Sequence, residues 1–146
     1  MPRILLNAHY QRGGAPSPPR PSPRSFHARL PGYDRSPLVR ATKLETELGL
    51  NRIWVKDESS RLGLPAFKIL GASWAVYRTA SAMLGAEPAS WTSIDELRDC
   101  LAPLRPLRLA TATDGNHGRA VARVARLLGL DASIFMPAGT AEARIR

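Results

Sequence analysis

The sequence has a single cysteine and no long hydrophobic run. One thiol, Cys100, excludes an internal disulfide framework and a thiolate metal cluster, and we expect it to fill apolar space on a helix. No apolar segment approaches the roughly 20 residues that span a bilayer, and the amino-terminal apolar stretch is too short for a secretory signal. These absences predict a cytoplasmic chain with no membrane partner. At 146 residues, it is long enough for one domain with its own core.

Acidic residues are scarce in the amino-terminal quarter. The net charge is +9, and residues 1–38 carry +5 of it with Asp34 as their one acid. The remainder interleaves both signs and shows no nucleic-acid-binding motif, so we expect no nucleic-acid partner. Residues 11–24, QRGGAPSPPRPSPR, cannot bury enough apolar surface to offset their ordering entropy. We predict a disordered Pro/Arg-rich leader over residues 1–25, with a Pro-rich recognition segment as the alternative, and a globular part over 26–146.

Helical and strand patterns alternate along the globular part, without internal repeats. Helices are predicted over residues 41–48, 69–84, 93–101 and 116–128, and from 141 onward; strands are predicted over 53–56, 107–111 and 132–136. Gly49 and Gly129 stand where helices end, and residues 93–96, SIDE, have the form of a capping box. This alternation predicts an α/β fold, a parallel sheet in a three-layer αβα arrangement. Ligands of such sheets bind outside the carboxyl ends of the strands.

The first chemical motif is AFKILGA, residues 66–72. Lys68 falls at the start of a predicted helix, where the positive end of the helix dipole and burial would favour its neutral amine. A neutral amine is what imine chemistry requires, and arginine cannot replace it. The chain has only three lysines against eighteen arginines, which favours a specific role for this one. Phe67 could wall a cofactor site and Gly71 could allow close backbone approach; an ordinary exposed helix lysine is the alternative.

The second motif is TDGNHG, residues 113–118, which follows a predicted strand. Gly115 and Gly118 permit turns, and successive backbone N–H groups entering a helix form a concave anion site. Asn116 can both donate to and accept from a ring oxygen, and Asp114 could act as a base or hold a positive group. Helix capping is the alternative for the acid and the amide. We expect His117 to be a hydrogen-bonded structural residue, with a catalytic role as the alternative. The spacing of Asp114, Asn116 and His117 is not that of metal ligands.

In this order, about 45 residues apart, the two motifs resemble the fold-type-II pyridoxal-phosphate enzymes, the tryptophan-synthase-β and threonine-dehydratase superfamily. The resemblance is closest to the diaminopropionate ammonia-lyase branch and covers about four fifths of the chain, from Phe26 to the end. It rests on four segments: LPGYxxSPL at 30–38, VKDESxRxGLxAFKxLGA at 55–72, TDGNHGRxVA at 113–122 and FMP at 135–137. Asp114, where threonine dehydratases usually place serine, points to this branch. Leu62 departs from it, since phenylalanine is usual there.

The resemblance implies a role for each matching residue. Lys68 would form the imine link to pyridoxal 5'-phosphate and move protons, beside Phe67, and Asn116 would contact the cofactor ring oxygen. Asp114, Gly115 and His117 would receive the substrate carboxylate, and Asp114 would serve as a second base or steer the β-ammonium of either enantiomer of 2,3-diaminopropionate. The implied reaction is α,β-elimination to pyruvate and ammonia in an enzyme that is homodimeric at full length.

The chain lacks the glycine-rich loop with which this family holds the cofactor phosphate. We therefore expect it to be an amino-terminal portion that binds the cofactor weakly and does not turn over by itself, and that exposes apolar surface. Two alternatives stay open: a serine/threonine dehydratase or threonine-synthase-like enzyme with the same cofactor, and a catalytically silent fragment that only binds.

Overall fold

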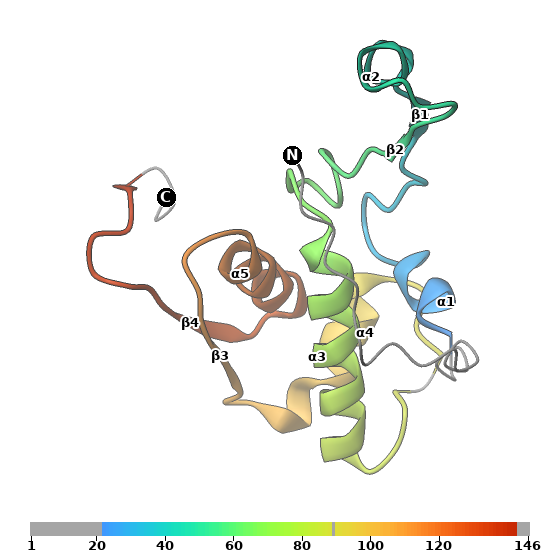
Figure 1. The fold of residues 1–146 in the computed structure, drawn as a ribbon. Helices are drawn as coiled ribbons and strands as arrows, with labels where there is room; N and C mark the ends of the chain where they lie inside the picture. Colours follow the sequence, from blue (N-terminus) through green and yellow to red (C-terminus); the bar gives the residue numbers. More distant parts are fainter. Residues whose placement is uncertain (1–21, 89, 143–146) are drawn as a thin grey trace, which may run out of the picture.

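The computed structural model describes residues 22–88 and 90–142 (Figure 1). Its elements, in chain order, are α1 (Pro23–His27), β1 (Leu38–Arg40), α2 (Thr42–Leu48), β2 (Trp54–Lys56), α3 (Lys68–Leu84), α4 (Ile94–Cys100), the 3₁₀ helix η1 (Ala102–Leu104), β3 (Arg108–Ala112), α5 (Asn116–Leu128) and β4 (Asp131–Phe135). Within these ranges no helix combines the length and apolarity needed to cross a membrane. Most of the predicted leader lies outside the described residues, although α1 begins at Pro23. The helix expected from 141 onward also falls largely outside them.

A parallel strand pair carries the α/β character of the fold. β3 and β4 run parallel, with Arg108 opposite Asp131 and Ala112 opposite Phe135, and α5 is the connection between them. Leu109 of β3 and Ile134 of β4 pack against the apolar core. The predicted α/β class is therefore confirmed, and the helices predicted over 41–48, 69–84, 93–101 and 116–128 are all present within one or two residues.

The strand predicted over 53–56 does not join that parallel pair. β2 instead pairs antiparallel with β1, Leu38 opposite Lys56 and Arg40 opposite Trp54, so placing it in the parallel sheet was wrong. Strand β1 is not predictable from residues 38–40, because three residues are too few to show an alternating pattern. The Glu45 carboxylate closes this unit: it accepts two hydrogen bonds from Arg40, at 2.8 and 2.9 Å, and one from the Ile53 N–H at 2.8 Å.

The β1–α2–β2 unit lies apart from the helices that form the core (Figure 1). Its large apolar side chains are exposed, at fractions of 43 to 62%: Leu38, Val39, Leu44, Leu48, Leu50, Trp54 and Val55. The apolar surface expected from the sequence is therefore found, concentrated on this unit.

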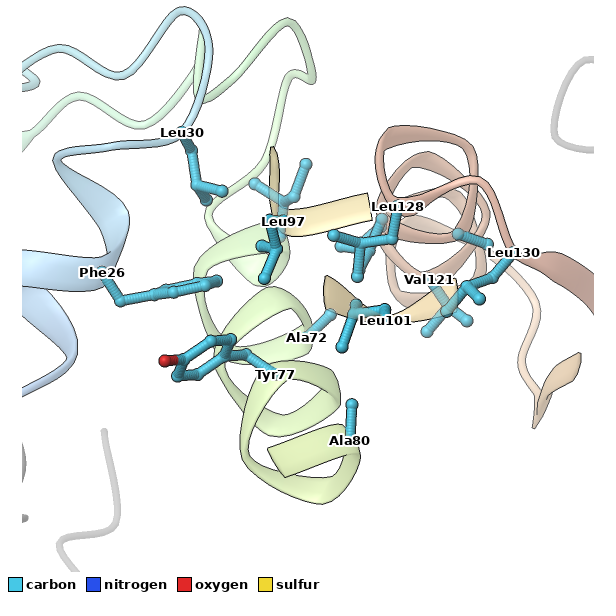
Figure 2. Packing of buried hydrophobic residues seen from close by; sticks show 14 of the residues in the cluster. Phe26, Leu30, Ala72, Tyr77, Ala80, Leu97, Leu101, Val121, Leu128 and Leu130 are labelled. Atoms are coloured by element: carbon cyan, nitrogen blue, oxygen red, sulfur yellow. The ribbon is translucent and has the colours of Figure 1, made fainter. Parts of the chain in front are cut away.

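The core lies where α3 meets α1, α5 and η1, with α4 packed against α5. Figure 2 shows Phe26 and Tyr77 at one end and Leu128 and Leu130 at the other, with Leu97 and Leu101 of the α4–η1 segment between them. Phe26 is the centre of an aromatic cluster, with ring centroids 4.6 Å from Tyr77, 5.5 Å from Trp74 and 5.8 Å from Trp91. α3 packs most extensively against α5, which fixes the two helices that begin with the candidate motifs.

The predicted helix ends are confirmed. Gly49 and Gly129 both adopt left-handed backbone, at φ 64° and 65°, directly after α2 and α5. At the start of α4, the Ser93 hydroxyl accepts the Glu96 N–H at 3.2 Å. The Glu96 carboxylate reaches back to the N–H of Thr92 at 2.6 Å, one residue before the position that a capping box prescribes.

Gly118 lets α5 approach the strand pair closely. A Cβ at this position would lie 2.6 Å from Thr113 Cγ2 and 2.8 Å from Ile134 Cγ2. The sequence argument that Gly118 and Gly115 serve turns does not hold, since neither has a positive φ and a Cβ on Gly115 would meet open space. Close approach is likewise not found at Gly71, whose Cβ would meet no heavy atom within 4 Å.

These two helical glycines give a matched prediction. Gly118→Ala should destabilise the fold by about 1–3 kcal/mol, because the added methyl group overpacks the contact with Thr113 and Ile134. Gly71→Ala should be neutral or stabilising by up to about 1 kcal/mol, as expected for a helical glycine with open space around it. Urea unfolding of both variants measures the difference; equal midpoints would contradict the packing role of Gly118.

Candidate active site

Lys68 is the first residue of α3 and its side chain is exposed. Among residues 22–88 and 90–142 its ammonium has no hydrogen-bond or ion-pair partner, so the amine is available to an aldehyde. The burial expected from the sequence is not found, because no described segment covers this end of the helix. Phe67, at the N-cap, is 61% exposed and makes no side-chain capping bond, so the first turn of α3 begins without a cap.

The second motif forms the turn from β3 into α5. Gly115 is the N-cap of α5 and provides no side-chain hydrogen bond, while its own N–H donates to the Thr113 hydroxyl at 3.3 Å. Asn116 and His117 open the helix, and both side chains are exposed, as is that of Asp114. The hydrogen-bonded structural role expected for His117 finds no partner in the described part of the chain.

A groove of about 360 Å³ runs along α3 from Ala72 to Met83, beside β3 and the beginning of α5. Ala72, one turn after Lys68, and His117, next to Asn116, both line it. The groove therefore reaches both motif regions, but Lys68 and Asn116 themselves are not among its lining residues. No hydrogen bond joins these two side chains in the described residues.

The loop before Lys68 is held by a buried arginine. The Arg61 side chain, 6% exposed, donates from Nε to Glu58 Oε2 at 2.7 Å and from Nη2 to the Ser36 hydroxyl at 2.5 Å. It also donates to the Asp34 carbonyl, and Ser36 donates to Glu58. The hydrogen bond from Arg61 is the main cause that lowers the pKa of Glu58 from 4.5 to about 2, and the same pair raises the pKa of Arg61. We name Arg61, Glu58, Ser36 and the Asp34 carbonyl the Arg61 network.

The sequence indicates no structural role for Arg61 and Glu58 beyond their place in the family resemblance. The signal available was a Glu and an Arg three residues apart in a loop rich in glycine and serine. Between Arg61 and Leu64 the chain makes a tight turn through Leu62 and Gly63, at φ 51° and 78°. Leu62 is 4% exposed, so its burial helps hold a backbone conformation that favours glycine.

The donors present suit pyridoxal phosphate in chemical type. A primary amine without a partner can bind an aldehyde, a side-chain amide can meet a phenolic oxygen, and the uncapped N-terminus of α5 leaves backbone N–H groups for an anion. No glycine-rich loop for the phosphate is present in the sequence. The amine, the amide and the backbone N–H groups therefore fit the aldehyde and phenolic oxygen of the cofactor and the carboxylate of an amino-acid substrate.

Comparison with known proteins identifies the family. The family model described as pyridoxal-phosphate dependent enzyme matches residues 29–146, so the chain belongs to this family. This confirms the resemblance drawn from the two motifs.

Within this family, the chain is similar to enzymes named diaminopropionate ammonia-lyase. The chain is 38% identical over 122 residues to the diaminopropionate ammonia-lyase of Escherichia coli K12, and 40% identical over 124 residues to that of Salmonella typhimurium. The alignments cover 84% and 80% of this chain. The crystal structure of the E. coli enzyme in apo form superposes with a TM-score of 0.74, and its complex with D-serine with 0.75, each over 84% of this chain at 38% identity. The chain spans about 30% of the length of these curated relatives, and 33% and 31% of the two solved chains.

The Arg61 network predicts a pH dependence of stability. Because the pKa of Glu58 is lower in the folded chain than its ordinary value of 4.5, this carboxylate stabilises the fold above about pH 4.5, and the contribution is lost as the pH falls toward 2. Glu58→Gln should therefore lower the unfolding free energy at pH 6 by about 1–3 kcal/mol and flatten its dependence on pH below 4.5. The exposed Glu47→Gln on α2 is the control and should do neither. Parallel urea titrations from pH 2 to 7 measure both effects; an unchanged slope in Glu58→Gln would contradict the assignment.

Proposed function

We propose that this chain carries the lysine-bearing portion of a pyridoxal-phosphate dependent ammonia-lyase that converts 2,3-diaminopropionate to pyruvate and ammonia. The observation that supports this best is the Lys68 amine at the start of α3, unpartnered among the described residues and carried by a helix that packs against α5, whose first residues Asn116 and His117 follow Asp114-Gly115. The names of the relatives, diaminopropionate ammonia-lyases at 38–40% identity, support the choice of substrate. A cytoplasmic location, a homodimeric full-length enzyme and a domain beginning at residue 26 stay predictions.

In this proposal, some residues of the chain hold the cofactor and others bind the substrate. Lys68 Nζ would hold the cofactor at its aldehyde carbon and, as a free amine in the substrate complex, would take the proton from the substrate α-carbon. Asn116 would donate to the ring oxygen, and Phe67 would lie beside the ring. The backbone N–H groups from Gly115 to His117 bind the substrate carboxylate at the positive end of α5. When bound, pyridoxal phosphate supplies an electron-withdrawing ring that stabilises charge developing on the substrate α-carbon.

Asp114 sets the substrate class in this proposal. Its carboxylate can pair with the β-ammonium group of 2,3-diaminopropionate, which serine and threonine lack. On the face of the substrate opposite Lys68 it can also accept the α-proton, so that both enantiomers react. A serine/threonine dehydratase, the alternative, needs no acid at this position, because its substrates have no β-ammonium group to bind.

The first test measures which lysine reacts with the cofactor. Pyridoxal phosphate is added to the chain, the adduct is trapped with borohydride, and the three lysines are compared by peptide mass spectrometry. Lys68 should carry most of the label, because Lys43 lies on α2, away from the start of α5 that would bind the cofactor, and the Lys56 ammonium is hydrogen-bonded to the Ser36 carbonyl. Lys68→Ala should lose this label and leave Lys43 and Lys56 unchanged. Equal labelling of all three would contradict the proposal.

The second test asks for turnover. Residues 29–146 replace the matching segment of the E. coli relative, and ammonia and pyruvate are measured with each enantiomer of 2,3-diaminopropionate, with serine and with threonine. Asp114→Asn in this chimera should slow one enantiomer about 100-fold, as expected for loss of a general base, and spare the other. Preference for serine or threonine would favour the dehydratase instead. An equal effect of Asp114→Asn on both enantiomers would contradict its role as the second base and favour pairing with the β-ammonium alone.

A further inference from the structure

A buried imidazole lies directly behind the lysine-bearing turn. His27, the last residue of α1, is 8% exposed, and its Nε2 lies 2.8 Å from the carbonyl oxygen of Leu70. Leu70 is two residues after Lys68, in the first turn of α3. A carbonyl oxygen only accepts hydrogen bonds, so Nε2 carries the proton and donates. The pKa of His27 is lowered, chiefly by desolvation and further by the nearby Arg61, so the ring is held neutral.

The ring is fixed on its other sides by aromatic contacts. Phe26 meets it edge to face at 5.3 Å between centroids, and Tyr33 stacks on it at 6.4 Å with the ring planes 12° apart. The Arg61 guanidinium lies 5.5 Å from the centroid of Tyr33. Residues 26–36 therefore hold the chain on both sides of Lys68: through the Arg61 network before it, and through His27 after it.

The first turn of α3 has few other constraints on its orientation. No side chain caps it, and both Phe67 and Lys68 are exposed. Ile69 is fully buried, but apolar contact is non-directional and does not fix rotation of the turn about the helix axis. The Ser73 hydroxyl also donates to the Leu70 carbonyl, at 3.1 Å, but it belongs to the same helix and ties α3 to nothing else. Among residues 22–88 and 90–142, the hydrogen bond from His27 is the directional tie between this turn and another element.

We propose that His27 is a positioning residue for Lys68: its hydrogen bond to the Leu70 carbonyl sets the direction in which the Lys68 amine projects toward the cofactor. The inference rests on the proposed function, in which Lys68 is the cofactor-binding lysine. His27 itself touches neither cofactor nor substrate.

The test compares two substitutions of His27 in the lysine-labelling experiment. His27→Phe keeps a ring of similar size and removes the donor, whereas His27→Gln retains an N–H that can reach the same carbonyl. The measured quantity is the ratio of pyridoxal phosphate trapped on Lys68 to that on Lys43, at a temperature well below the melting point of each variant. Lys43 lies on α2, in the β1–α2–β2 unit, away from His27. It serves as the internal reference, because a general loss of stability would not change the labelling of Lys68 relative to Lys43 in one direction. Ser73→Ala is the matched control, since it removes the other donor to the same oxygen.

The proposal expects the ratio to fall about threefold to tenfold in His27→Phe, the population shift from losing one hydrogen bond. It should return toward the original in His27→Gln and stay unchanged in Ser73→Ala. An unchanged ratio in His27→Phe, no recovery in folded His27→Gln, or an equal fall in Ser73→Ala would each overturn the positioning role and leave the proposed function standing. If the unsubstituted chain shows no preference for Lys68, it is the proposed function that fails.

One measurement is independent of whether the variants fold. Nitrogen NMR of ¹⁵N-histidine-labelled chain at pH 7 reports which ring nitrogen of His27 is protonated. A neutral ring with the proton on Nε2 supports the hydrogen bond to Leu70, and a proton on Nδ1 alone would overturn it.

Discussion

The position of the candidate site depends on one buried cation. Arg61 places three of its guanidinium nitrogens on Glu58, Ser36 and the Asp34 carbonyl, and the planar fork of arginine makes this possible where a lysine ammonium could not. Such a group is costly to bury unless every donor finds a partner, and removing one partner leaves the others uncompensated. The network joins the segment that leaves the core before β1 to the segment that returns after β2. It therefore fixes the path by which the chain enters α3 and presents Lys68.

The site is an open arrangement of exposed groups. Lys68, Asp114, Asn116 and His117 all face solvent in the described residues, and the groove along α3 that reaches His117 is lined mainly by apolar side chains. Elimination chemistry on a charged amino acid gains from the exclusion of water, which strengthens each electrostatic contact within the site. The chain corresponds to about 30% of the length of the similar ammonia-lyases, and the exposed faces of Phe67 and Phe135 add apolar surface next to the two motifs.

Helices with a periodic apolar pattern over many residues, or with a glycine at their end, were predictable from the sequence. The 17-residue α3 and 13-residue α5 follow helical spacing, and Gly49 and Gly129 mark helix ends by the backbone they must adopt. Strand β1 was missed because its three residues have no pattern of their own and gain stability only from β2 and Glu45. His27 was overlooked for the same kind of reason, since its partner is a backbone carbonyl 43 residues away that no sequence pattern can mark. The chemical roles that the motifs assign to Lys68, Asp114 and Asn116 stay predictions, whereas the use of Gly118 for helix–strand packing and the exposure of Lys68 follow from tertiary structure alone.

The geometry of the β1–α2–β2 unit has a consequence for how such chains can vary. Since the Arg61 network fastens the outgoing and incoming strands of this excursion at its base, the length of what lies beyond the fastening does not alter the approach to α3. Insertions or deletions around Leu50, between α2 and β2, can therefore be accommodated without displacing the Lys68 amine. The excursion can change in length or sequence as long as the few charged and polar residues at its root keep their hydrogen bonds.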